Sequence, residues 1–338
     1  MVATSEQQSS AWPDKTARAR LHFVSGKGGT GKSTVAAALA LSLAEGGRRV
    51  LLVEVEGRQG IAQLFDVPPL PPQETKVASV DGGGEVNALA VDIETAFLEY
   101  LDMFYNLGFA GRAMRRFGAI EFATTIAPGL RDVLLTGKIK ECVVRSDTSG
   151  NRVYDAVVVD APPTGRINNF LDVTKAMADL AKGGPVRAQS EGVVRLLHSD
   201  ETAVHLVTLL EALPVQETAD AAAQLVASDL RLGSIVVNRT SPQFLPEDAI
   251  DAIAAGDVDA EAIRNGLKGS GVELPDDEFA GLLTENIEHA AVLRAQEESA
   301  GQLGEVDGAR LELPALADGV DLGGLYELAE YLKEQGVR

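Results

Sequence analysis

Four residues near the amino terminus have the types and the spacing that suit the binding of a nucleotide's phosphates. The pattern G-x-x-x-x-G-K-[ST] is matched by Gly26, Gly31, Lys32 and Ser33. Glycines let successive backbone N–H groups turn inward around phosphate oxygens, and a helix that begins at the lysine adds its positive amino end. Lys32 is spaced to reach the β- and γ-phosphates, and the Ser33 hydroxyl to bind Mg²⁺. The sequence therefore predicts a site for ATP and Mg²⁺ formed by Gly26, Lys27, Gly28, Gly29, Thr30, Gly31, Lys32, Ser33 and Thr34.

A second candidate for the Mg²⁺ site is Asp160. It ends the apolar run 157–159, and a carboxylate in this position holds Mg²⁺ in phosphate-loop enzymes, often through water. The alternative is an aspartate that caps the following turn. Two prolines and a glycine follow in the segment 160–166, which indicates either a stiff loop with a hinge that senses the γ-phosphate or a plain loop.

The elements that must position these residues alternate between apolar runs and helical patterns. Residues 21–24 predict a strand before the loop, and residues 32–45 predict a helix after it, apolar on nearly all sides and therefore buried. Further strands are expected at 50–53, 153–160, 204–210, 234–238 and 309–313, with an edge strand at 86–91. This alternation predicts an α/β fold with a doubly wound, mostly parallel sheet, a P-loop NTPase with helical insertions.

The domain boundaries follow from composition and periodicity. Residues 1–19 are polar and are expected to form a disordered tail, so that the P-loop ATPase domain covers 20–338. Two stretches depart from the strand–helix alternation: a helical insertion at about 94–150 and an acidic helical insertion at about 241–304.

Composition excludes several classes of function. A formal net charge of −20 argues against binding to nucleic acid and against adhesion to anionic lipid, both of which need clustered Lys and Arg. No apolar run approaches the ~18 residues of a membrane span, so we expect a cytoplasmic protein without direct membrane insertion. The single cysteine, Cys142, excludes an intrachain disulfide and a Cys-x-x-Cys metal site in this chain, and a small buried residue is the favoured interpretation.

Three segments together resemble the arsenite-pump ATPase family, which includes the ATPase that targets tail-anchored membrane proteins. They are the loop at 26–34, the Asp-Ala-Pro-Pro-Thr-Gly segment at 160–165 and the Val-Val-Asn-Arg segment at 236–239. The resemblance covers about residues 21–332 and is closest to the actinobacterial branch of anion-transporting ATPases.

The resemblance implies roles for five residues. Lys27, the extra lysine of a deviant Walker A loop, would cross a dimer interface to the partner's nucleotide and would act in catalysis with Lys32; the alternative is a solvated surface lysine. Asn238 would bind adenine, because an amide can donate and accept hydrogen bonds. Arg239 would lie beside it or on the open surface, and Pro314 falls where the family has its adenine loop.

The chain also departs from the family pattern. Glu56 stands where the family has the aspartate that positions the attacking water, and its longer side chain predicts slow hydrolysis, since a misplacement of about 1 Å can cost about 100-fold. The cysteine pair of a zinc-closed dimer is absent, and one cysteine cannot form the metalloid site of an arsenite pump, so arsenite or anion pumping is not expected.

Two main hypotheses follow. The first is a slow, Mg²⁺-dependent ATPase that acts as a nucleotide-switched homodimer, or as a heterodimer with a paralogous ATPase, and couples ATP to a client or partner protein. The second is an ATP-binding regulatory module with little turnover. A third, a membrane-cycling or chromosome-partitioning ATPase, is disfavoured because the segment 325–332 is acidic. A client would bind the first helical insertion through Phe97, Leu101, Phe104, Tyr105, Leu107, Phe109 and Met114, unless these residues pack the insertion's own core.

Overall fold

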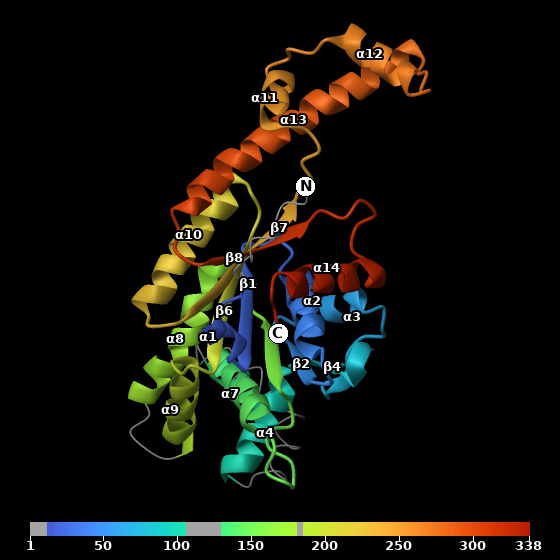
Figure 1. The fold of residues 1–338 in the computed structure, drawn as a ribbon. Helices are drawn as coiled ribbons and strands as arrows, with labels where there is room; N and C mark the ends of the chain where they lie inside the picture. Colours follow the sequence, from blue (N-terminus) through green and yellow to red (C-terminus); the bar gives the residue numbers. More distant parts are fainter. Residues whose placement is uncertain (1–11, 106–129, 181–184) are drawn as a thin grey trace.

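Apolar runs form the centre of one eight-stranded sheet (Figure 1). The computed structural model describes residues 12–105, 130–180 and 185–338. Its strands lie in the order β3-β4-β2-β5-β1-β6-β7-β8, and all neighbours are parallel except β3 and β4. Their bounds are β1 Leu21–Gly26, β2 Arg49–Glu54, β3 Thr75–Ser79, β4 Glu85–Ala90, β5 Ala156–Asp160, β6 Thr202–Thr208, β7 Leu232–Thr240 and β8 Ala309–Pro314. The predicted α/β fold with a mostly parallel sheet is confirmed.

Helices cover both faces of the sheet, as a parallel sheet of continuous apolar strands requires. One face packs against α2 Lys32–Ala44, α3 Gly60–Leu64 and α14 Leu322–Glu334. The other packs against α4 Ile93–Tyr105, α7 Leu130–Val144, α8 Thr164–Leu180, α9 Pro185–Leu197 and α10 Ala212–Ala227. The helix after the loop, α2, is buried at 11 of its 13 residues, as its uniform Ala and Leu content predicts.

A helical arm lies between β7 and β8. It consists of α11 Glu247–Ala254, α12 Ala260–Gly269 and α13 Asp276–Gly304, and Figure 1 shows α12 and much of α13 projecting away from the sheet. At its far end, the guanidinium of Arg264 lies 4.1 Å from the ring centroid of Phe279. At its near end, Leu303 packs against β7 and α10. The arm is therefore anchored at one end and exposed at the other.

The amino-terminal segment corrects one expectation from the sequence. Residues 12–19 do not form a disordered tail but pack on the sheet, with a short helix, α1 Asp14–Ala17. Trp12 is 2% exposed, and its ring stacks on those of His205 and His22 at centroid distances of 5.2 and 5.9 Å. Stacking on buried rings supplies the apolar contact that the polar composition of this segment did not predict.

The two histidines beneath Trp12 form a hydrogen-bonded chain. The backbone N–H of Ser234 donates to Nδ1 of His205 at 3.1 Å, so His205 carries its proton on Nε2. That nitrogen donates to Nδ1 of His22 at 3.1 Å, and Nε2 of His22 donates to the carbonyl of Ala19 at 3.2 Å. Burial lowers the pKa of His22 to about 4 and that of His205 well below its ordinary value, so both rings are neutral.

Two other expectations are corrected. The strand expected at the edge, 86–91, is β4, and it is internal because β3 pairs with it on the outside. The segment 160–166 is not a hinged loop throughout, because helix α8 begins at Thr164. Pro163 precedes that first turn, where the absence of a proline N–H costs no hydrogen bond.

Across the part of the chain that the structure describes, no helix has the length and apolar character that crossing a membrane requires.

Candidate functional site

The glycine loop lies between the end of β1 and the start of α2, at the carboxyl edge of the sheet. Gly29 and Gly31 have φ angles of 91° and 88°, a left-handed conformation that residues with a Cβ rarely adopt. A Cβ on Gly26 would lie 2.3 Å from the carbonyl oxygen of Val207, so glycine is also required there by contact. Gly28 and Gly29 are exposed at the mouth of the loop. The result is a backbone cradle that fits a phosphate group at the amino end of a helix.

The cradle is joined to Asp160 through Ser33. The Ser33 hydroxyl, in the first turn of α2, donates a 2.5 Å hydrogen bond to Oδ2 of Asp160 at the end of β5. Thr34, the next residue, is half-buried. β5 is the direct parallel neighbour of β1, which explains why two residues 127 positions apart meet. A hydroxyl and a carboxylate at this point form the oxygen donor set that Mg²⁺ prefers.

Charges around Asp160 and Lys32 are closely coupled. Burial raises the pKa of Asp160 to about 6, the Ser33 hydrogen bond and the Lys32 charge oppose this, and Glu54 and Glu56 add to it. Burial lowers the pKa of Lys32, against the attraction of Asp160 and Glu56. The site therefore combines one buried ammonium with several carboxylates, an arrangement that fits a phosphate and a divalent cation together.

Glu56 follows β2 and lies close enough to affect both Lys32 and Asp160. Its side chain is 20% exposed and contacts two arginines: Oε2 lies 3.3 Å from Nη2 of Arg58, and Oε1 lies 3.7 Å from Nη1 of Arg166. Neither arginine was identified as a site residue from the sequence: Arg166 needs the fold to bring it to Glu56, whereas Arg58, two positions from Glu56, could have been found from its proximity in the chain. In this arrangement the Glu56 carboxylate is held by cations on two sides.

Lys27 has a partner within its own chain. Its Nζ lies 3.2 Å from Oε1 of Glu217 on α10, and the two side chains are 28% and 36% exposed. The Thr30 hydroxyl donates to the Lys27 carbonyl at 2.9 Å and so fixes the backbone of the loop at this lysine. The ion pair was not expected from the sequence, since Glu217 lies in an ordinary amphipathic helix 190 positions away.

Asn238 lies beside the loop. It is 4% exposed, and its Nδ2 donates to the carbonyl of Thr30 at 2.8 Å, so its amide nitrogen supports the cradle. Arg239 is exposed and has a left-handed φ of 56°. Pro314 ends β8 opposite Thr240, one strand further from the loop. The structure thus brings Asn238 to the loop and places Arg239 and Pro314 at the adjoining strand ends.

The candidate client surface is only partly described. Phe97 is 8% exposed and packs in the core beneath the sheet, which favours the packing interpretation for that residue. Leu107, Phe109 and Met114 lie outside the described residues, as do the side chains of Leu101, Phe104 and Tyr105.

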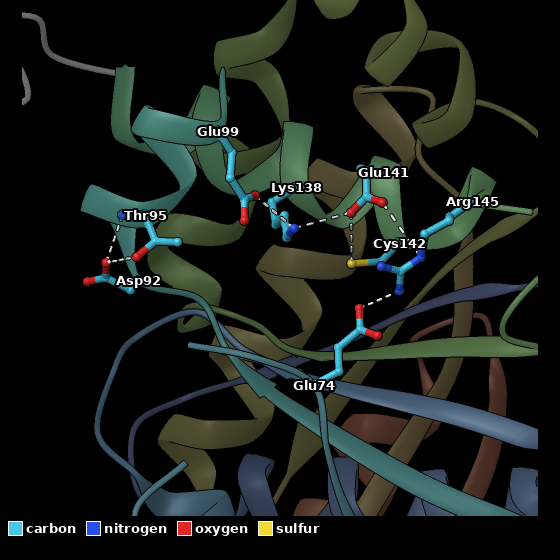
Figure 2. A network of polar contacts seen from close by, with 8 residues as sticks. All are labelled: Glu74, Asp92, Thr95, Glu99, Lys138, Glu141, Cys142 and Arg145. Carbon is cyan, nitrogen blue, oxygen red and sulfur yellow. Dashed lines mark hydrogen bonds and ion pairs between the residues drawn. The ribbon is translucent and has the colours of Figure 1, made fainter. Parts of the chain in front are cut away.

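Away from the loop, a polar network joins α4, α7 and the residue before β3 (Figure 2). Lys138 contacts Glu99 at 2.9 Å and Glu141 at 3.3 Å, and Arg145 pairs with Glu74. The Cys142 thiol, within this network, donates to Glu141 at 3.7 Å. Burial raises the pKa of Cys142 to about 12, so the thiol is unreactive and the prediction of a buried structural cysteine is confirmed.

The fold and the loop define the class of protein. The central parallel strand β1 leads through a glycine cradle into a buried helix, and an aspartate lies at the end of the neighbouring strand β5. This is the architecture of a P-loop NTPase.

Comparison with known proteins then gives the family. Residues 19–184 match the sequence model of the anion-transporting ATPase family. The chain is 67% identical over 340 residues to ATPase BagA of Mycobacterium tuberculosis, covering 100% of both proteins. The arsenical pump-driving ATPase of Acidiphilium multivorum is 26% identical over 273 residues, which span 75% of this chain and 45% of that protein. The chain belongs to the anion-transporting ATPase family, and these relatives support ATP hydrolysis as its general activity.

Proposed function

We propose that the chain is a Mg²⁺-dependent ATPase that works as a nucleotide-switched dimer and couples ATP binding and slow hydrolysis to a client or partner protein. The observation that carries this proposal is the hydrogen bond from Ser33 to Asp160, directly below a glycine cradle that also contains Lys32. Hydroxyl, carboxylate and ammonium then converge on the place where the β- and γ-phosphates would lie.

Each residue has a distinct task in this proposal. Backbone N–H groups of the loop hold phosphate oxygens, and Lys32 neutralises charge on the β- and γ-phosphates. Ser33 and Asp160 are the residues that would hold Mg²⁺, which supplies charge stabilisation at the transferring phosphoryl group when bound. Glu56 orients the attacking water or accepts its proton.

Slow hydrolysis is supported by the environment of Glu56. Its carboxylate contacts Arg58 and Arg166, so both of its oxygens already have a cationic partner that an attacking water would have to compete with. The same observation favours the alternative, an ATP-binding regulatory module with little turnover. Arsenite pumping is not part of the proposal, because Cys142 is the chain's single cysteine and is buried.

Single-turnover hydrolysis distinguishes the slow ATPase from the ATP-binding regulatory module. We expect wild type to hydrolyse bound ATP slowly, Glu56→Asp to change the rate by about 10-fold or more, and Lys32→Ala to lose ATP hydrolysis. Glu85→Gln, at the opposite end of the sheet, serves as a control. If wild type and all variants match a blank without protein while wild type still binds ATP, the regulatory module is the better description.

The dimer is supported by Lys27, which lies at the mouth of the loop and which the family resemblance assigns to the partner's nucleotide. In the single chain it is paired with Glu217, so dimer formation would require the exchange of one carboxylate partner for a phosphate. Sedimentation with saturating Mg-ATP tests this: we expect a dimer for wild type and a monomer for Lys27→Ala. The proposed dimer is contradicted if the wild-type protein remains monomeric both alone and when mixed with a paralogous ATPase.

A further inference from the structure

Glu54 is a buried carboxylate to which the proposed function gives no role. It is the last residue of β2 and is 2% exposed. Apart from the exposed Arg49 at its start, the rest of the strand is apolar. Val50 and Leu52, which share the face of Glu54 by strand alternation, belong to the core beneath α2. A glutamate in this position is costly to bury unless something compensates its charge.

Strand register places Glu54 next to Asp160. The two residues are direct partners in the parallel pair of β2 and β5, and both lie two positions beyond core residues of the α2 face, Leu52 and Val158. Neighbouring strands lie about 4.8 Å apart, so their carboxylates emerge side by side on the same face. The charge of Glu54 accordingly helps to raise the pKa of Asp160.

The hydrogen bonding of Glu54 is incomplete. Oε1 accepts a long, 3.4 Å hydrogen bond from the backbone N–H of Gly60, at the start of α3. Oε2 is buried and has no hydrogen-bond partner among the described residues. Gly60 in turn borders Ser33, because a Cβ on Gly60 would lie 3.9 Å from the Ser33 hydroxyl oxygen. The unsatisfied carboxylate is thus placed beside the Ser33–Asp160 pair.

We propose that Glu54 is a third oxygen-bearing residue of the Mg²⁺ site, beside Ser33 and Asp160. This inference rests on the proposed function. Mg²⁺ retains several water ligands when a protein binds it, and a free carboxylate oxygen is a strong acceptor for the protons of such water. A divalent cation also compensates two adjacent buried carboxylates, which explains how a costly glutamate is tolerated in the core.

The proposal has a consequence for nucleotide binding. Two adjacent carboxylates repel the phosphates of a nucleotide that arrives without metal, and they stabilise one that arrives with it. Removing the charge of Glu54 should therefore weaken metal binding while metal-free nucleotide binds equally well or better. A purely structural role, through the Gly60 N–H alone, would affect both forms of the nucleotide alike.

The test uses the full chain with ADP and Mn²⁺, whose binding is measured by electron paramagnetic resonance. We expect Glu54→Gln to bind Mn²⁺ about 10-fold more weakly in the presence of ADP, a typical loss for a residue that supports a metal's ligands. Binding of a fluorescent ADP analogue in EDTA should not weaken. Glu85→Gln, a carboxylate at the opposite end of the neighbouring strand β4, should behave as wild type.

The outcomes separate this inference from the proposed function. If wild type does not bind Mn²⁺ with ADP, both fail; if wild type and Glu54→Gln bind it equally, only the role of Glu54 fails. Hydrogen exchange on wild type gives a second readout that does not depend on the folding of a variant. The Gly60 amide should exchange more slowly with ADP and Mg²⁺ than with ADP and EDTA, and identical rates would overturn the proposal.

Discussion

The carboxyl group of Asp160 illustrates how a candidate site residue can act against the stability of its own fold. Burial and the neighbouring carboxylates of Glu54 and Glu56 raise its pKa to about 6, despite the Ser33 hydrogen bond. The folded protein therefore binds a proton at this site more tightly than the unfolded chain does. The protonated form of Asp160 therefore contributes to the stability of the fold. This contribution is fully present below the ordinary aspartate pKa and is lost as the pH rises through about 6.

Asp160→Asn tests this in the metal-free protein. In EDTA at pH 7.5 the substitution should raise the free energy of unfolding by about 1–3 kcal/mol, because it removes a buried charge while retaining an acceptor for Ser33. Near pH 4 the effect should vanish, since Asp160 is then protonated in wild type. Urea unfolding at both pH values measures the difference, and an equal destabilisation at both would contradict this account.

Glu217 offers a second test at the level of residues. Its pair with Lys27 is partly exposed, so Glu217→Gln should change the free energy of unfolding by less than about 1 kcal/mol. In the proposed dimer, however, releasing Lys27 should favour association with Mg-ATP several-fold. Sedimentation equilibrium measures this against Glu211→Gln, an exposed carboxylate at the start of the same helix. Unchanged or weaker association would show that the pair does not compete with the interface.

At the level of elements, local patterns predicted most of the sheet and the loop but not the contacts between distant segments. β1, α2 and β5 could be predicted because apolar runs and the glycine loop are short-range signals. β3 was missed because its alternation is weak, with only Ala78 buried. The contacts of Lys27 with Glu217 and of Glu56 with Arg166 could not be predicted, because each depends on strand order or helix packing.

The docking of the amino-terminal segment should be sensitive to acid. His22 and His205 are neutral, and Nε2 of His205 donates a 3.1 Å hydrogen bond to Nδ1 of His22. Protonation of either ring is therefore unfavourable in the folded state, while the unfolded chain accepts the proton. Stability should therefore fall as the pH decreases from about 6.5 toward about 4. Trp12 is the single tryptophan of the chain, so its fluorescence reports the change directly.

A matched pair of variants assigns this effect. His22→Asn should reduce the dependence of the urea midpoint on pH between 6.5 and 4.5. His198→Gln, which replaces an exposed histidine, should leave it as in wild type. If the two variants have the same pH dependence as wild type, the buried pair is not the origin of the acid sensitivity.

At the level of the whole molecule, charge is concentrated in the arm. Residues 241–304 contain 14 acidic and three basic side chains, which account for −11 of the formal −20. Helix α12 has no buried residue, so its contribution to the core is small. The arm therefore adds a highly charged surface, and we expect its tip to contribute little to the stability of the body.

Removing the tip tests this separation. Replacing residues 256–273 with a short Gly/Ser linker should lower the melting temperature by less than about 2 °C, since surface changes rarely exceed 0.5 kcal/mol. Single-turnover hydrolysis by the isolated protein should not change. As a contrast, Leu303→Ala, at the anchored end, should cost about 2–5 kcal/mol. A large loss of stability from the tip deletion would mean that the arm and the body fold as one cooperative unit.

The position of β3 also limits how two chains can associate. An exposed edge strand invites pairing with another sheet, and polar residues, lysines and bulges are common defences against it. β3 forms such an edge: it is short, carries Lys76 with a half-exposed side chain, and has an irregular register between Lys76 and Ala78. Sheet-to-sheet extension at this edge is therefore disfavoured. Association through the carboxyl ends of the strands, where Lys27 lies, leaves this edge free and does not require continuous pairing of backbones.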